Sequence, residues 1–256
     1  MLRRSLLVVA LLGLVACSDT DDATPTAPTT DATVVTDSTA ATGGDVTRHT
    51  FTTADGTEIE YVLLVPEGRV PGEPGKVLFA FPPGGQDIDL AERIVTDRYR
   101  AAALERGYVV VSPAAPSTGL FFTDASAALV PELLDAIATE YPPDDGRFDL
   151  MGVSNGGLSA FVAAIAMPER FRSLVVFPGN SPDGGDDPAL ANLDTLGVAM
   201  FVGANDTGWL EDARATKATL EDLGITVELT EVSGEGHIIE SLTGDDLFDA
   251  VERVRT

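Results

Sequence analysis

One serine stands between glycines, at a point where a buried strand is followed by a small-residue stretch typical of a helix. The segment LMGVSNGGLSAF (150–161) places Gly152, Ser154 and Gly156 in the pattern Gly-x-Ser-x-Gly. A serine on a sharp strand-to-helix turn needs small neighbours two positions away, because larger side chains would strike the adjacent strand and helix. Such a turn exposes the hydroxyl and points the helix N-terminus at developing negative charge. The pattern predicts a nucleophile at Ser154; the alternative is a capping serine in a glycine-rich turn.

A nucleophilic serine requires a base, and the sequence contains two histidines. His237 follows the last predicted strand in VSGEGHIIE, where Gly234 and Gly236 allow the loop to turn back over the sheet edge. His49 precedes every strand end that could carry a catalytic group, and we expect it at the surface. His237 is therefore the predicted general base.

The base needs a carboxylate to fix its tautomer and to stabilise the imidazolium. Asp206, in MFVGANDTGW, directly follows a predicted strand. The chain order Ser154, Asp206, His237 is that of an α/β-hydrolase triad, and it differs from the orders in chymotrypsin and subtilisin. The alternative role for Asp206 is helix capping. Three nearby carboxylates are alternative acids: Glu211, Asp212 and Asp194.

An oxyanion hole requires backbone N–H groups with no side chain over them. FAFPPGGQDID follows the third predicted strand; there Pro82 and Pro83 stiffen the chain, and Gly84 and Gly85 allow close approach of a substrate oxygen. The second donor is expected to be the N–H of Asn155, next to the nucleophile.

Three aromatic residues near the predicted strand ends are candidates for a substrate pocket. Phe121 and Phe122 lie in STGLFFTD, and Trp209 follows Asp206; the alternative for each is a place in the core. The acidic run 183–187 has no spacing of a calcium loop and is expected to be a solvated turn. The sequence predicts no metal and no organic cofactor.

Strand and helix patterns alternate along residues 47–256. Two strands are expected around a hairpin at Asp55-Gly56. Further strands are predicted at 76–81, 108–114, 147–153, 172–179, 197–205 and 225–232. Helices are predicted at 90–107, 126–141, 157–167, 210–224 and near 238–254, with a local irregularity at Pro131. Such alternation predicts a mostly parallel sheet with helices on both faces, which binds ligands beyond the carboxyl ends of its strands. Only about 18 residues separate the sixth and seventh predicted strands, too few for a large lid.

The first 46 residues predict export and a tether. Residues 1–17 combine two arginines, an apolar run and small residues before Cys17, which resembles a bacterial lipobox with lipidation at that cysteine. The alternative is an ordinary secretory signal. Residues 18–46 are rich in Thr, Asp, Ala and Pro and are predicted to be a disordered tether. We therefore expect one domain, 47–256, outside the cytoplasm and anchored to a lipid bilayer.

The charge balance excludes one class of partner. The 41 acidic and 16 basic residues give a formal net charge of −25, which would repel phosphate backbones. We expect no nucleic-acid binding, and we expect a monomer.

The stretch PPDDGRFDLMGVSNGGLSAFVAAIAMPERF (142–171) resembles secreted esterases of the α/β-hydrolase superfamily, the group of polyhydroxybutyrate depolymerases and feruloyl esterases. The resemblance covers residues 50–256, with GAND and GEGH as further specific parts. It implies a triad of Ser154, Asp206 and His237, and an oxyanion loop at Gly84 and Gly85. The sequence departs from the family where Pro82-Pro83 replaces the usual His-Gly pair.

These observations predict an extracytoplasmic serine esterase that cleaves small or polymeric esters through an acyl-enzyme, with activity that falls as the pH drops through roughly 6 to 7 because protonated His237 cannot accept a proton. A serine peptidase or amidase on the same fold is one alternative. A surface-binding lipoprotein that has lost turnover is the other.

Overall fold

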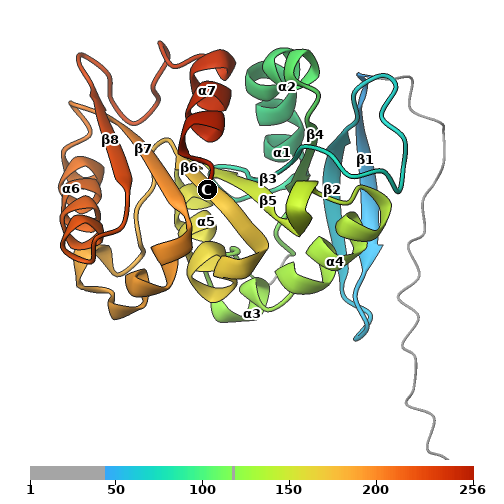
Figure 1. The fold of residues 1–256 in the computed structure, drawn as a ribbon, viewed down its shortest axis with the longest axis horizontal. Coiled ribbons are helices and arrows are strands. Elements are labelled where there is room, and N and C mark those ends of the chain that lie inside the picture. The colour runs from blue at the N-terminus through green and yellow to red at the C-terminus, as the bar shows by residue number, and fades with distance from the viewer. Residues whose placement is uncertain (1–43, 117–118) are drawn as a thin grey trace, which may run out of the picture. The chain divides into compact units, whose positions relative to one another are not determined.

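A central sheet organises the part of the chain that the computed structural model describes, residues 44–116 and 119–256. Within these residues eight strands pair in the order β1-β2-β4-β3-β5-β6-β7-β8 (Figure 1). β2 pairs antiparallel with both β1 and β4, and every other neighbouring pair is parallel. The predicted signal segment, Cys17 and residues 18–43 of the predicted tether lie outside the described residues.

The strands lie where the apolar runs predict them. Their bounds are β1 Val46–Thr52, β2 Glu58–Leu64, β3 Val77–Phe81, β4 Val109–Pro113, β5 Phe148–Gly152, β6 Phe171–Val176, β7 Gly197–Gly203 and β8 Val227–Val232. The predicted hairpin at Asp55-Gly56 joins β1 to β2 and is confirmed. β3 to β7 are buried along their whole length, because helices cover both faces of the parallel part of the sheet.

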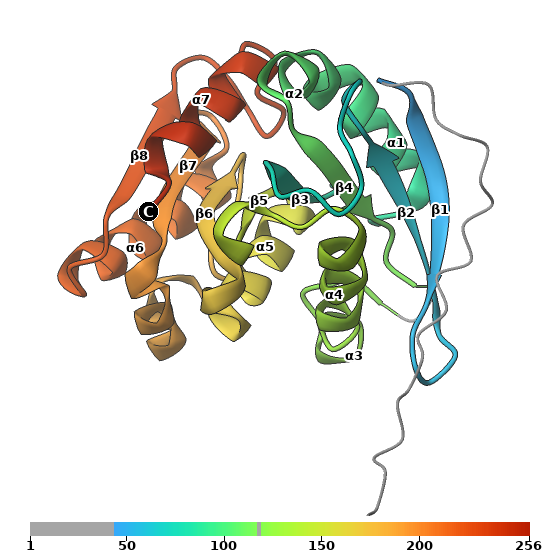
Figure 2. The same cartoon turned by 45° about the vertical axis from the view of Figure 1, so that its right-hand side comes forward.

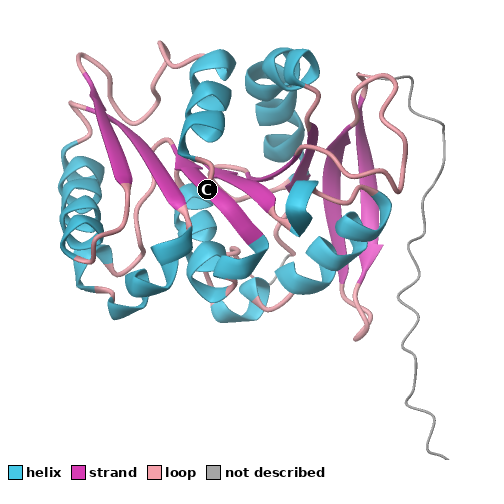
Figure 3. Ribbon diagram, in the orientation of Figure 1, coloured by secondary structure: helices cyan, strands magenta, loops and turns pink. Residues whose placement is uncertain are grey.

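Helices form a layer on each side of the sheet (Figures 2 and 3). α1, α2 and α7 pack into one apolar cluster, whereas α4, α5 and α6 pack into a cluster on the other face. The α-helices are α1 Ile88–Ile94, α2 Arg100–Arg106, α3 Asp124–Ala127, α4 Val130–Glu140, α5 Asn155–Ala166, α6 Thr207–Asp222 and α7 Gly244–Val254, and a π-helical segment, Val95–Tyr99, joins α1 to α2. The expectation of a mostly parallel sheet between two helical layers is confirmed.

Two predicted helices differ from those observed. The helix predicted at 126–141 is divided into α3 and α4, and the irregularity expected at Pro131 is confirmed, since Pro131 lies in the first turn of α4, where its missing N–H has no intrahelical role. The helix predicted near 238–254 begins only at Gly244. Thr243 caps it by accepting the N–H of Asp246, whose carboxylate in turn accepts the N–H of Thr243.

A buried ionic network fastens the end of the chain to the sheet. Asp149, near the amino end of β5, is completely buried. It accepts hydrogen bonds from Ser173 (2.7 Å) and Arg172 (3.1 Å) on β6 and from Arg255 (2.6 Å), which follows α7. The network lies at the edge of the sheet opposite the strand ends that are predicted to be catalytic.

The opposite edge brings together the segments that follow β3, β5, β7 and β8, since these strands are parallel. The connection between β6 and β7 contains two 3-10 segments, Gly184–Asp186 and Pro188–Thr195, and no large helical lid. Among the described residues, no helix has both the length and the apolar character needed to cross a membrane.

Candidate active site

Ser154 forms the sharp turn between β5 and α5. Its backbone has φ 57° and ψ −122°, a strained conformation for a residue with a side chain. The turn is held from both sides, since the Ser154 N–H donates to Pro178 O (2.9 Å) and the Gly157 N–H donates to Ser154 O (2.7 Å). The hydroxyl is thereby presented beyond the end of β5.

The glycines on either side of Ser154 are required by contacts with backbone atoms. A Cβ atom on Gly152 would lie 2.1 Å from the carbonyl oxygen of Gly156, and one on Gly156 would lie 2.2 Å from the carbonyl oxygen of Phe81. Side-chain carbon atoms do not approach oxygen so closely. The Gly-x-Ser-x-Gly pattern therefore has the steric origin that the sequence indicated.

A continuous chain of hydrogen bonds joins Ser154, His237 and Asp206. Ser154 Oγ lies 2.8 Å from His237 Nε2, and His237 Nδ1 lies 2.7 Å from Asp206 Oδ2. Because an ionised carboxylate only accepts, Nδ1 carries the proton in this arrangement and Nε2 is left to accept one. These are the three residues that the sequence selected.

The alternative acids and the second histidine are not part of this hydrogen-bonded series. Among the described residues, Asp206 is the carboxylate that contacts His237 within 4 Å. The side chain of Asp206 accepts no capping hydrogen bond at the start of α6. His49 lies on the edge strand β1, half-buried and stacked on Tyr61.

The loop that carries His237 is closed by Glu235, a residue that no local pattern in the sequence marks. The Glu235 carboxylate accepts the N–H groups of Ser241 (3.0 Å) and Glu240 (3.3 Å), and its carbonyl accepts the N–H of Asn205 (2.8 Å). The hydrogen bonds from Ser241 and Glu240 lower the pKa of the Glu235 carboxyl. Glu235 thus holds the histidine loop in shape and ties it to the segment that precedes Asp206.

The loop after β3 approaches the first turn of α5. Asn155 Nδ2 donates to Gly84 O (2.8 Å), and the Gln86 N–H donates to Pro83 O (3.0 Å). Gly84 has φ 60°, and both Gly84 and Gly85 are exposed. In the described part of the chain, the backbone N–H groups of Gly84, Gly85 and Asn155 have no hydrogen-bond acceptor. The structure thus brings the three predicted oxyanion-hole residues together beside Ser154.

The three predicted pocket residues have different surroundings. The Trp209 ring packs on the His237 ring, with centroids 5.2 Å apart. Phe121 is buried against Phe81 in the core, so its position is that of a core residue and does not support a place in the pocket wall. Phe122 is half-buried.

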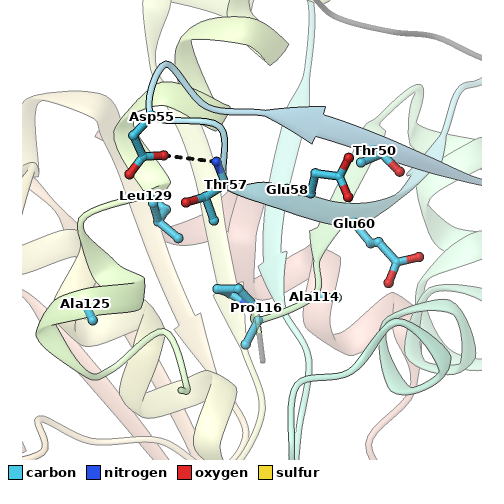
Figure 4. A pocket seen from close by; sticks show the side chains of 10 residues that line it. Thr50, Asp55, Thr57, Glu58, Glu60, Ala114, Pro116, Ala125 and Leu129 are labelled. Carbon is cyan, nitrogen blue, oxygen red and sulfur yellow. Dashed lines mark hydrogen bonds between the residues drawn. The ribbon is translucent and has the colours of Figure 1, made fainter. Parts of the chain in front are cut away.

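A pocket of about 550 Å³ lies beyond the end of β4 (Figure 4). Its lining comes mostly from β1, β2 and the segment after β4, and these strands are four, three and two places from β5 in the sheet, so at about 4.8 Å per strand the pocket lies roughly 10–20 Å from the strand that carries Ser154. It is lined by Thr50, Asp55, Thr57, Glu58, Glu60, Ala114, Ala115, Pro116, Ala125 and Leu129. The Asp55 carboxylate accepts the N–H of Thr57 (3.0 Å). No group of three or more His, Cys, Asp or Glu side chains that could hold a metal ion occurs among residues 44–116 and 119–256.

The known proteins that this chain matches are similar to it in three-dimensional structure. No protein-family model matches the sequence, and no curated protein matches it. An S-formylglutathione hydrolase from Agrobacterium tumefaciens superposes with a TM-score of 0.64 at 20% identity, over 84% of this chain and 98% of that one. A ferulic acid esterase matches with a TM-score of 0.61 at 15% identity, over 82% and 97%. This chain has the α/β-hydrolase fold.

Longer proteins share the same fold. A thermostable esterase matches with a TM-score of 0.63 at 20% identity over 82% of this chain, which spans 60% of that enzyme's length. Dipeptidyl peptidase 4 from Porphyromonas gingivalis matches with a TM-score of 0.61 at 16% identity over 80% of this chain, which spans 35% of the peptidase. The fold predicted from the sequence is confirmed, and it occurs in both esterases and peptidases.

Proposed function

We propose that the protein is a serine hydrolase that cleaves carboxylic esters through an acyl-enzyme intermediate. The observation that carries the proposal is the hydrogen-bonded series from Ser154 through His237 to Asp206, with Ser154 held at a positive φ on the turn before α5. A serine with no chemical role has no need of this strained conformation or of a histidine held by a carboxylate.

The geometry supports a two-step reaction. His237 Nε2 takes the proton of Ser154 Oγ as the oxygen attacks the ester carbonyl carbon, and a tetrahedral oxyanion forms. The C–O bond to the alcohol then breaks, and His237 gives its proton to the departing oxygen. Water repeats the sequence on the acyl-enzyme: its proton passes to Nε2, its oxygen attacks the carbonyl carbon, and the proton returns to Ser154 as the acid leaves.

The hydrogen bonds of the loop after β3 favour Gly84 over Gly85 as the first oxyanion donor. A trans peptide has its C=O and N–H on opposite sides. Since Gly84 O accepts from the Asn155 side chain, the Gly85 N–H points away from Asn155. Since Pro83 O accepts the backbone N–H of Gln86, the Gly84 N–H points away from that hydrogen bond, and among the described residues it has no acceptor. We therefore assign the hole to the N–H groups of Gly84 and Asn155.

The short connection after β6 and the resemblance seen in the sequence support an ester substrate, and the N-terminal segment supports a place outside the cytoplasm. The short connection between β6 and β7 leaves the site open, which suits a polymeric ester or a small one. The resemblance to the polyhydroxybutyrate depolymerase and feruloyl esterase group favours esters. The lipobox-like end at Cys17 supports a lipid-anchored protein outside the cytoplasm.

Peptide or amide hydrolysis is the second candidate, because serine hydrolases of this fold also include peptidases such as the dipeptidyl peptidase above. The deciding experiment measures full-length protein with p-nitrophenyl acetate, butyrate and octanoate beside p-nitroanilide amides. We expect ester turnover that falls at least about 10³-fold in Ser154→Ala and is unchanged in the exposed-serine control Ser233→Ala. Faster turnover of the amides would favour a peptidase, and equal rates in wild type and Ser154→Ala would refute the proposal.

A further inference from the structure

Gln86 is a buried and strained residue in an otherwise exposed loop. Its relative exposure is 0%, whereas its neighbours Gly84, Gly85 and Asp87 are exposed. Its φ of 55° is unfavourable for a residue with a side chain, and such strain persists only where surrounding contacts hold it. The contacts of the Gln86 side chain are therefore the reason that the loop has its shape.

The side-chain amide of Gln86 binds three separate segments. Nε2 donates to Ser159 Oγ on α5 (2.9 Å) and to Pro82 O at the end of β3 (3.3 Å). Oε1 accepts the backbone N–H of Phe121 (2.8 Å), in the segment between β4 and α3. The Gln86 carbonyl also accepts the Ala115 N–H (2.7 Å). The loop is thereby fastened both to α5 and to the segment that follows β4.

These bonds close a ring that passes through both residues whose N–H groups are assigned to the oxyanion hole. Ser159 lies one turn after Asn155 and donates to Asn155 O (3.0 Å). Asn155 Nδ2 donates to Gly84 O (2.8 Å), and Gly84 is connected through Gly85 to Gln86. The ring thus links the carbonyl groups of Gly84 and Asn155, each in the peptide unit next to a donor N–H, from two directions.

We propose that Gln86 is a positioning residue that sets the separation of the Gly84 and Asn155 N–H groups. The inference rests on the proposed function and extends it to a side chain that does not touch the substrate. An oxyanion hole acts mainly on the tetrahedral oxyanion rather than on the bound ester. Loss of the Gln86 amide should therefore lower kcat and leave KM nearly unchanged.

The test compares full-length wild type with Gln86→Met, which keeps an unbranched side chain but removes the amide. With p-nitrophenyl butyrate we expect kcat to fall about 10- to 100-fold, because removal of a whole donor costs about 10²–10³ in kcat. KM should stay within about twofold. The affinity for butylboronic acid, which forms a tetrahedral adduct on serine, should fall in parallel with kcat. The pH profile should keep its shape, since His237 and Asp206 are unchanged.

Two further variants separate positioning from general stability. Ser159→Ala cuts the link to α5 and should lower kcat and boronate affinity together, with less than additive loss when combined with Gln86→Met. Leu220→Ala removes a buried side chain of α6 outside the ring and should lower stability with little change in kcat.

The inference is wrong if, in an active wild type, Gln86→Met and Ser159→Ala change kcat no more than Leu220→Ala, or if they raise KM alone while boronate affinity is kept. A wild type that neither hydrolyses the ester nor binds the boronic acid would refute the proposed function, and the role of Gln86 with it.

Discussion

Gly156 lies in the first turn of α5, where replacement by alanine would ordinarily stabilise a helix by about 0.5–1 kcal/mol. Here the added Cβ would lie 2.2 Å from the carbonyl oxygen of Phe81 and 2.5 Å from that of Pro82. Both atoms belong to the backbone, so the strain is relieved only by moving β3 and the loop after it. Overpacking of this kind costs about 1–3 kcal/mol, which exceeds the gain in helix propensity.

We therefore expect Gly156→Ala to lower the free energy of unfolding by about 1–2 kcal/mol, since the clash outweighs the propensity gain. The displaced loop should also slow labelling of Ser154 by a fluorophosphonate at least about 10-fold, because a displacement of about 1 Å at catalytic groups can cost about 10²-fold in rate. The assay is urea unfolding followed by far-ultraviolet circular dichroism, beside the rate of labelling.

Gly208→Ala is the matched control, a helical glycine in the first turn of α6 where an added Cβ would have no heavy atom within 4 Å. It should keep or raise stability, by up to about 1 kcal/mol. If Gly156→Ala is as stable as Gly208→Ala and labels at the wild-type rate, then the steric explanation of the turn is wrong.

Three other predictions concern buried charge, pH and the single tryptophan. Asp149→Ala leaves two arginines without their buried partner and should cost about 3–5 kcal/mol in urea unfolding, with Ser154 labelling unchanged in the folded protein. Burial lowers the pKa of His49, so as the pH falls the unfolded chain binds a proton before the folded protein does, and the free energy of unfolding decreases. His49→Gln should therefore lose less of its free energy of unfolding than wild type when the pH is lowered from about 7.5 to 5.5. Trp209 is the only tryptophan, and because its ring packs on the His237 ring, its fluorescence emission should change in His237→Gln.

The residues of the turn and the fold could be predicted because their signals are local in the sequence. Gly152 and Gly156 flank Ser154 at fixed spacing for a steric reason, and Asp206 and His237 lie three and five residues after the ends of β7 and β8. Since parallel strands end at one edge of the sheet, residues that follow several strands could be grouped without coordinates.

The supporting residues could not be predicted in this way. Gln86 bonds to residues 35 and 73 positions away, and nothing local in PPGGQD indicates those partners. Glu235 was missed because one acidic residue among 41 carries no distinguishing signal. The late start of α7 has a local signal, the pair Thr243 and Asp246, but Ile238, Ile239 and Leu242 extend the helical pattern of apolar residues before it.

Phe121 shows the limit for aromatic residues. Its position after β4 was compatible with both a pocket and the core, and the choice depends on Phe81, which packs against it from β3 with ring centroids 5.2 Å apart. Only the packing of distant strands decides such a case.

The central claim is that His237 activates Ser154 as a nucleophile. The most direct measurement treats full-length protein with a fluorophosphonate probe and locates the adduct by peptide mass spectrometry, beside His237→Ala and Ser154→Ala. We expect an adduct on Ser154 in wild type, a rate at least about 10³-fold lower in His237→Ala, and none at that position in Ser154→Ala. Absence of an adduct in folded wild type, or equal labelling without His237, would contradict the claim.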